Sequence, residues 1–277
     1  MFNTVALAYT YDGSFEGLLC CVFESYTWKE VPLAIHSEED GQGLLLESKW
    51  IDTDYAKADR VLKAIPLRIC SEALELTRLG FWTCTPDKEL LLLNFLQLGF
   101  THGVKVMDML ANDTVDALLK AVQQLKREGH HYMGFVRFSI YGPVMAAVIE
   151  PRSFVLPVIQ DHFCDRFRGE SFLIYDKTHG MALIHQPGRQ AIIPLDDWTL
   201  PEPDLVEDKY RRLWEGFYDA IAIQERRNEG LRSSLMPKRY WKHLPEMKGS
   251  RTAVPNTNIK LGESRHQLEN GEFHSTD

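Results

Sequence analysis

The sequence predicts an α+β fold, and three features of its hydrophobic pattern lead to this expectation. Residues 4–10 alternate as a short strand, and a tight turn leads from it into a helix. From about residue 53 to 130 the apolar residues follow helical spacing. From about 131 to 195 the pattern changes to short alternating segments separated by turns, which indicates a mainly antiparallel sheet. A long amphipathic helix is then expected at about 204–229.

The first half of the chain is read as one strand followed by helices. Ser14 is expected to cap the helix after the first strand, because Ser, Thr, Asp and Asn accept hydrogen bonds from the free N–H groups of a first turn. Asp12 then lies at the carboxyl end of that strand, where α/β proteins often place functional side chains. The helices of the central block are expected at 55–65, 67–79, 87–100 and 113–129, with Thr85-Pro86 starting the third, Asp113 capping the fourth and Gly129 ending it.

The second half is expected to form a sheet with the order β-β-α-β-β-β. Its strands and helix are expected at 132–140, 144–149, 157–167 (helix), 172–175, 181–185 and 190–194, the last as an edge strand. We expect residues 1–247 to form a single domain. The last residues, 248–277, are polar, without periodicity, and are predicted to be disordered.

Composition limits the classes of function that are open to the chain. Its net charge is −8 and its isoelectric point is about 5.7, so any contact with nucleic acid requires a local basic patch or a pocket for one nucleotide. The five cysteines have no C-x-x-C spacing, which favours free thiols and gives no expectation of a metal site or cofactor. The chain shows no secretion signal, and its longest apolar stretch, about 90–100, is too short to span a bilayer. We therefore expect a cytoplasmic protein without a membrane partner.

Several segments carry a resemblance to a known family. They are Tyr11–Leu19, His130–Phe138, Asp161–Phe167, Ile174–Gly180, Trp214–Tyr218, Ile221–Ile223, Arg226–Asn228 and Met236–Glu246. Together they resemble the DUF4130 family of bacterial proteins associated with DNA metabolism and repair, over about residues 1–247. The resemblance implies a radical-SAM partner protein of DNA modification or repair, and a similar segment is fused to uracil-DNA-glycosylase-like domains. The chain has no C-x-x-x-C-x-x-C triad, so it is not itself the radical-SAM enzyme.

A basic segment near the C-terminus is the main sign of nucleic-acid binding in the residues themselves. Between Arg226 and His243 there are six Lys or Arg residues against Glu229 alone, with two aromatic residues among them. Cations neutralise phosphates and aromatic rings stack on unpaired bases. The alternative is a solvated helix end and loop whose Trp241 docks into the core. The candidate DNA-binding residues are Arg137, Arg166, Arg226, Arg227, Lys238, Arg239, Tyr240, Trp241 and Lys242.

Two pairs of polar residues are candidates for catalysis. His162 and Arg166 lie four residues apart, so one helix face presents both and they could hold a phosphate. Local ion pairing with Asp161 or Asp165 is the favoured explanation, because such pairs are common on any helix. Asp176 and His179 lie at a hairpin tip, where the carboxylate could orient the imidazole as a general base. In the alternative interpretation Asp176 only closes the turn.

The remaining candidates are Asp12 and Arg137. Asp12 could join Ser14 and Glu16 in a carboxylate or metal site, but turn formation and helix capping explain the same residue types. Arg137 interrupts an apolar stretch and therefore requires a partner or a ligand.

The favoured hypothesis is a DNA-binding accessory protein, acting on single-stranded or damaged DNA beside a radical-SAM partner. One alternative is an enzyme acting on DNA or a nucleotide, of hydrolase or glycosylase type, with Arg137, His162, Asp176 and His179 in a cleft of the sheet. A further alternative is a scaffold that binds its partner protein through the helix containing Trp214 and Phe217.

Overall fold

The computed structural model describes residues 3–38, 47–195, 198–199, 205–221 and 228–248, and its α+β class is the predicted one. The first half contains β1 (Asn3–Tyr11), α1 (Phe15–Trp28), β2 (Glu30–Ser37), β3 (Glu47–Trp50), α2 (Tyr55–Arg68), α3 (Ser71–Phe81), α4 (Lys88–His102), the 3-10 helix η1 (Gly103–Asp108) and α5 (Asp113–Phe135). The second half contains β4 (Ser139–Tyr141), β5 (Val144–Ile149), α6 (Leu156–Arg166), β6 (Ser171–Asp176), β7 (Met181–Gln186), β8 (Arg189–Pro194), α7 (Leu205–Ile221), α8 (Glu229–Leu235), the 3-10 helix η3 (Lys238–His243) and α9 (Pro245–Lys248).

The N-terminal part contains a parallel sheet that the sequence pattern did not predict. Its strand order is β2-β1-β3, and both neighbours run parallel to β1. The predicted first strand is correct and lies in the centre, where Ala8 and Tyr9 are fully buried. The two outer strands were not predicted, because a parallel pair gives no hairpin signal along the sequence.

The central block is helical, as predicted, but several helix ends differ from the expectation. Helix α4 begins at Lys88, because Asp87 adopts a left-handed conformation with φ of 52°, so Thr85-Pro86 is not its first turn. Helix α5 is capped by the side chain of Asn112, which accepts from the N–H groups of Thr114 and Val115, and not by Asp113.

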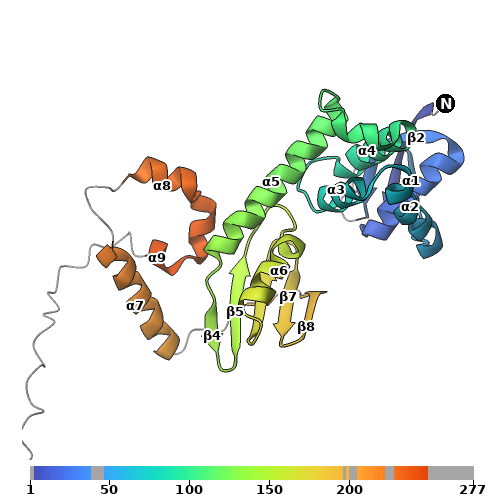
Figure 1. Cartoon of the computed structure of the whole chain (residues 1–277). Helices are drawn as coiled ribbons and strands as arrows, with labels where there is room; N and C mark the ends of the chain where they lie inside the picture. Colours follow the sequence, from blue (N-terminus) through green and yellow to red (C-terminus); the bar gives the residue numbers. More distant parts are fainter. Residues whose placement is uncertain (1–2, 39–46, 196–197, 200–204, 222–227, 249–277) are drawn as a thin grey trace, which may run out of the picture.

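Helix α5 also continues past Gly129 to Phe135, so the strand predicted from residue 132 does not begin until Ser139. Gly129 is buried against α6, and a Cβ there would lie 3.0 Å from Cγ1 of Val158. The glycine therefore allows a close approach of two helices and does not end its own helix. As Figure 1 shows, α5 (green) runs from the N-terminal helices to the second sheet.

The second sheet has the strand order β4-β5-β6-β7-β8. Three of its neighbouring pairs are antiparallel, as expected, but β5 and β6 are parallel because α6 forms a crossover between them. The hairpin between β6 and β7 is correct, with Gly180 at φ of +61° in its turn. The carboxyl ends of β5 and β6 consequently lie side by side, at Ile149 and Asp176.

The apolar segment Lys88–Asp108 is long and apolar enough to count as a weak candidate for a membrane span. Within it Leu92, Leu93, Phe95 and Leu96 have no exposed surface and belong to the hydrophobic core. These four side chains therefore attach one side of the helix to the core. The predicted C-terminal helix is present as α7 as far as Ile221. Residues 222–227 and the tail from residue 249 lie outside the described part of the chain.

Candidate functional site

Charged side chains from four parts of the chain gather where β5 and β6 end. Helix α5 contributes Glu128, the segment after β5 contributes Glu150, and the last residue of β6 and the turn after it contribute Asp176 and His179. The segment η3 adds Arg239, Tyr240 and Lys242. We call these seven residues the carboxyl-edge cluster. Open α/β proteins bind ligands beside the carboxyl ends of parallel strands, so this is the place in the second sheet where a site is expected.

Asp176 and His179 form a close pair, and both proposed roles of the aspartate have a geometric basis. The carboxylate is fully buried; its Oδ1 accepts the backbone N–H groups of Thr178 at 3.0 Å and His179 at 3.2 Å. Its Oδ2 lies 2.6 Å from Nδ1 of His179. The aspartate therefore closes the turn and also orients the ring, whose other side contacts Phe154 at 5.4 Å between centroids.

The chemistry of this pair follows from its burial. Burial raises the pKa of Asp176, while the hydrogen bonds from His179 and Thr178 act in the opposite direction. With its Nδ1–H donated to the carboxylate, the imidazole carries its lone pair on Nε2, the atom that accepts a proton in general-base catalysis. The imidazole side chain is 28% exposed, so solvent reaches the ring.

Glu128 is the second buried acid of the cluster and joins three segments. Its two carboxylate oxygens accept the backbone N–H groups of Arg152 and Ser153, each at 3.0 Å. The guanidinium of Arg239 lies 3.4 Å from the same carboxylate and donates to the hydroxyl of Tyr240 at 2.5 Å. Sequence analysis missed this acid, although its position was informative: Glu128 lies three residues after the buried Leu125, on the buried stripe of α5. A carboxylate on such a stripe requires buried partners.

The structure corrects the proposed role of Tyr240. This residue is 3% exposed, and its ring packs within 5.4 Å of the rings of His131, Tyr132 and Phe135, all on α5. Its hydroxyl lies 3.2 Å from Nδ1 of His131. An aromatic face that is covered on this scale cannot stack on a nucleic-acid base. The sequence pattern of cations and aromatic residues did not distinguish a stacking ring from a core ring.

Trp241 is half-buried beside the same segment. Its Nε1–H donates to the backbone carbonyl of Met236 at 2.9 Å, and Arg232 lies over its ring at 4.8 Å from the centroid. The neighbouring Leu244 is completely buried. Much of the basic segment is thus attached to the core, which agrees with the alternative interpretation in which Trp241 docks into the core.

The cations of this segment differ in how far they are neutralised. Lys242 and His243 both contact Oε1 of Glu150, at 2.6 and 3.3 Å, and Lys242 remains 60% exposed. Lys238 is exposed and forms no ion pair with any carboxylate of the described residues, although it lies 6.0 Å from the ring of Trp241. Arg226 and Arg227 lie outside the described residues.

Arg137 has the partner that its apolar surroundings required. It lies between α5 and β4, not on a strand, and its Nη2 and Nε donate to Oε1 of Glu246 at 2.8 and 3.2 Å. The side chain of Glu246 is only 1% exposed, and the guanidinium also lies 5.7 Å from the ring of Trp214. Arg137 therefore holds α9 and does not enter the carboxyl-edge cluster through any described contact.

The other predicted residues are not brought into the cluster. His162 lies in the middle of α6, where its Nε2 is buried without a hydrogen-bond partner among the described residues, and no described contact joins it to His179. Arg166, one turn further, lies 5.8 Å from the ring of Phe167. No three His, Cys, Asp or Glu side chains within the described ranges are arranged to hold a metal ion.

Asp12 lies in the N-terminal part and has a local role. Its carboxylate accepts from the N–H and hydroxyl groups of Ser14, at 2.9 and 2.6 Å, and from the hydroxyl of Thr53 at 2.7 Å. Burial alone would raise the pKa of Asp12, but these hydrogen bonds lower it overall. The hydroxyl of Ser14 caps α1 as predicted, accepting from the N–H of Gly17. Turn formation and capping thus account for both residues.

A different surface stands out on α7, where a stripe of large apolar side chains remains largely exposed. Glu207 and Arg211 attach its polar side to β4: Glu207 accepts the N–H of Ile140 at 3.2 Å and Arg211 donates to the hydroxyl of Ser139 at 2.6 Å. The adjoining stripe of the helix presents large apolar residues that are 40–59% exposed, and the residue at its inner border, Trp214, also contacts the guanidinium of Arg137. We call this the outer face of α7, formed by Tyr210, Leu213, Trp214, Phe217 and Ile221.

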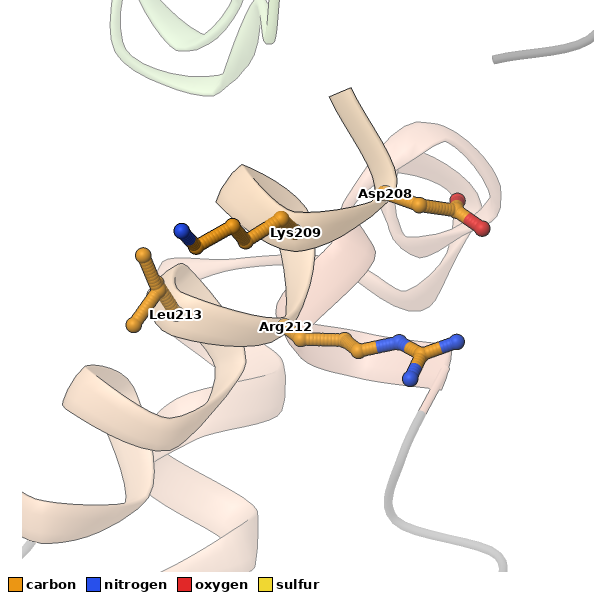
Figure 2. A pocket seen from close by; sticks show the side chains of 4 residues that line it. All are labelled: Asp208, Lys209, Arg212 and Leu213. Atoms are coloured by element: carbon orange, nitrogen blue, oxygen red, sulfur yellow. The ribbon is translucent and has the colours of Figure 1, made fainter. Parts of the chain in front are cut away.

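A hollow of about 320 Å³ lies at the start of this helix, and its described lining consists of Asp208, Lys209, Arg212 and Leu213. In Figure 2 Lys209 and Leu213 extend to one side of the helix, while Asp208 and Arg212 extend to the other. Lys209 and Arg212 are both exposed. Of the two cations, Lys209 therefore borders the apolar face beside Leu213, while Arg212 lies on the other side of the helix.

Fold and site together define an α+β protein with a charged cluster at the carboxyl edge of one parallel strand pair and an outward-facing apolar helix. The chain belongs to the family described as "Domain of unknown function (DUF4130)", whose model matches residues 86–246. This range begins just before α4 and ends in α9, so it contains the whole cluster and α7, but it is shorter than the 1–247 that the resemblance indicated and leaves out Asp12. No curated protein and no solved structure matches the chain.

Proposed function

We propose that this protein is an accessory protein of DNA repair or modification that docks a radical-SAM protein on the outer face of α7. The observation that carries the proposal is the exposure of five large apolar side chains on one helix face. A covered aromatic side chain buries about 150–250 Å², so this face exposes on the order of 400–500 Å² of apolar surface, a patch size that is often functional. The role in DNA metabolism and the identity of the partner rest on the family resemblance.

The surroundings of the face indicate the chemistry of the partner. Glu207 and Arg211 already occupy the polar side of α7, so the helix cannot rotate its apolar side inward without breaking their contacts with β4. The exposed cation Lys209 borders the face. The docking surface of the partner is therefore expected to be apolar in its centre and acidic at its rim.

The test measures the affinity of the purified protein for the radical-SAM protein of the same organism by calorimetry. The variant Leu213→Ser/Phe217→Ser removes two apolar side chains that are 59% and 54% exposed, together with the contact between the rings of Phe217 and Trp214. If each of these interface residues contributes about 1 kcal/mol, the two together give about 2 kcal/mol and the dissociation constant should rise about 30-fold. The control Leu67→Ser changes an 84% exposed residue on α2 and should leave the affinity unchanged. Absence of a wild-type complex, or equal binding by the double variant, would refute the proposal.

Direct contact with DNA is a second candidate function, favoured by the exposed cations of η3. Arg239 is 37% and Lys242 60% exposed, and Lys238 is exposed beside them. The buried Glu128 and the hydroxyl of Tyr240 hold Nη2 of Arg239, which leaves its Nε and Nη1 to donate to a phosphate. In this proposal the contacts with single-stranded or damaged DNA are made by cations, without stacking on Tyr240.

The measurement for this function is the salt dependence of binding to a fluorescent single-stranded DNA. Each phosphate contact adds about 0.7 to the slope of log K against log salt concentration, so Lys238→Ala/Arg239→Ala/Lys242→Ala should lower the slope by about 2. The matched control Lys63→Ala/Lys120→Ala removes two exposed cations from α2 and α5 and should lower it much less. An unchanged slope in the triple variant would exclude η3 as a DNA-binding surface.

A further inference from the structure

A hollow between α1 and α2 is not part of either surface described above. Its volume is about 170 Å³, and its base is formed by the buried side chains of Val22 and Val61 and by Ala64. Phe23 and Phe100 form apolar walls. Apart from Phe100, its lining precedes residue 86, where the family match begins. We call it the α1–α2 hollow.

Two arginines border the hollow at opposite ends. Arg60 and Arg68 lie eight residues apart on α2, about 12 Å along the helix axis, with Ala64 midway between them. Both are exposed, and neither forms an ion pair with a carboxylate of the described residues. The two lysines of the same helix that lie nearby are paired, Lys57 with Glu24 at 2.7 Å and Lys63 with Asp59 at 2.6 Å.

The side chains around these arginines do not supply the missing negative charge. The guanidinium of Arg60 lies over the ring of Phe23, 5.1 Å from its centroid. Burial raises the pKa of the nearby Tyr26 to about 12, with Arg68 opposing that rise, so its phenol is neutral at physiological pH. In a chain of net charge −8, the hollow is thus a local apolar surface with a positive charge at each end.

We infer that the α1–α2 hollow binds an acidic peptide segment of another protein, with one large apolar side chain inserted beside Ala64 and a carboxylate bound by each arginine. The hollow is too small to hold a whole cofactor or nucleotide, since small-molecule sites usually enclose about 300–1,000 Å³. It is sufficient for one anchoring side chain. Guanidinium groups bind carboxylates with paired, charge-assisted hydrogen bonds, so Arg60 and Arg68 would set both the charge and the spacing of the segment. This inference does not depend on the proposed function.

The experiment selects random 16-residue peptides displayed on phage against the full-length protein, then measures synthetic versions of the enriched sequences on four forms. These are the wild type, Ala64→Trp, which fills the hollow, Arg60→Glu/Arg68→Glu, which inverts its ends, and Lys63→Glu, a charge change outside the lining. We expect sequences with acidic residues on both sides of an aromatic residue or leucine. Their affinity should fall at least about 10-fold on the first two variants and stay unchanged on Lys63→Glu.

Three results would overturn the inference. One is that no enriched peptide loses affinity on Ala64→Trp or on the arginine variant. Another is that the enriched peptides lack carboxylates and bind Arg60→Glu/Arg68→Glu as tightly as they bind the wild type. The third is that a labelled single-stranded DNA competes with the peptides and itself depends on Arg60 and Arg68, which would assign the hollow to nucleic acid. Thermal unfolding followed by circular dichroism confirms that each variant is folded. If Ala64→Trp does not fold, the surface charge variant still decides the outcome.

Discussion

Replacement of Tyr240 distinguishes most directly between a role of its ring in the hydrophobic core and a role in binding nucleic acid. The ring is 3% exposed and lies at 5.0–5.4 Å from three rings of α5. Truncation of a buried aromatic residue to alanine costs about 3–5 kcal/mol. At about 2–4 °C per kcal/mol for a chain of this size class, Tyr240→Ala should melt on the order of 10 °C below the wild type. Differential scanning calorimetry measures this shift.

The conservative variant Tyr240→Phe keeps the ring and removes the hydroxyl that contacts His131 and Arg239. Its expected cost is about 1–2 kcal/mol, because each neutral or charge-assisted hydrogen bond contributes on this order. Tyr55→Ala is the control, since Tyr55 is 75% exposed and should change stability by less than about 0.5 kcal/mol. If Tyr240→Ala melted within 2 °C of the wild type (roughly the effect of 1 kcal/mol) while losing DNA binding, the assignment of the ring to the core would be wrong.

Three further perturbations test other contacts. Glu246→Ala leaves Arg137 without its carboxylate partner. Because the Arg137 side chain is 28% exposed, the free energy of unfolding measured in urea should fall by about 1–3 kcal/mol, which is less than the cost of breaking a fully buried ion pair. Asp176→Asn keeps the acceptor for two backbone N–H groups but faces Nδ1 of His179 with a donor. The neutral imidazole should then move its proton to Nε2, which nitrogen NMR detects; an unchanged tautomer would contradict the pairing. Burial would raise the pKa of Glu207, but the hydrogen bonds from Arg211 and from the backbone lower it overall. The ionised Glu207 therefore stabilises the folded protein above about pH 4.5, and this stabilisation is lost as the pH falls. Glu207→Gln should reduce the loss of stability on acidification.

Helical periodicity was the most informative part of the sequence for the fold. It located α2, α3, α4 and α5 within a few residues, because each buries one continuous apolar stripe. The first sheet was missed for a physical reason: β3 is a four-residue strand without a buried side chain, and its pairing with β1 depends on a segment far away in the chain. The end of α5 was missed because Gly129 was interpreted through backbone preference, whereas packing against α6 decides its conformation.

In the candidate site too, contacts between residues close in the sequence could be predicted, and contacts between distant residues could not. The pairing of Asp176 with His179 was accessible because the two residues are three positions apart in one turn. The partners of the cations were not: Arg137 and Glu246 are separated by 109 residues. Charge along a short segment predicted an exposed basic surface, but distant acids on α5 and after β5 neutralise part of it.

The position of α5 has a consequence for any shortened version of the protein. Its first half lies against α3, closely enough that a Cβ on Gly80 would fall 2.7 Å from Leu118, and its second half supports α6 and Tyr240. A fragment limited to residues 86–246, the range of the family match, would lack α3 and would expose the apolar side of α5 that packs against it. Any fragment used for binding measurements should therefore retain the first 85 residues, so that misfolding is not mistaken for loss of a ligand.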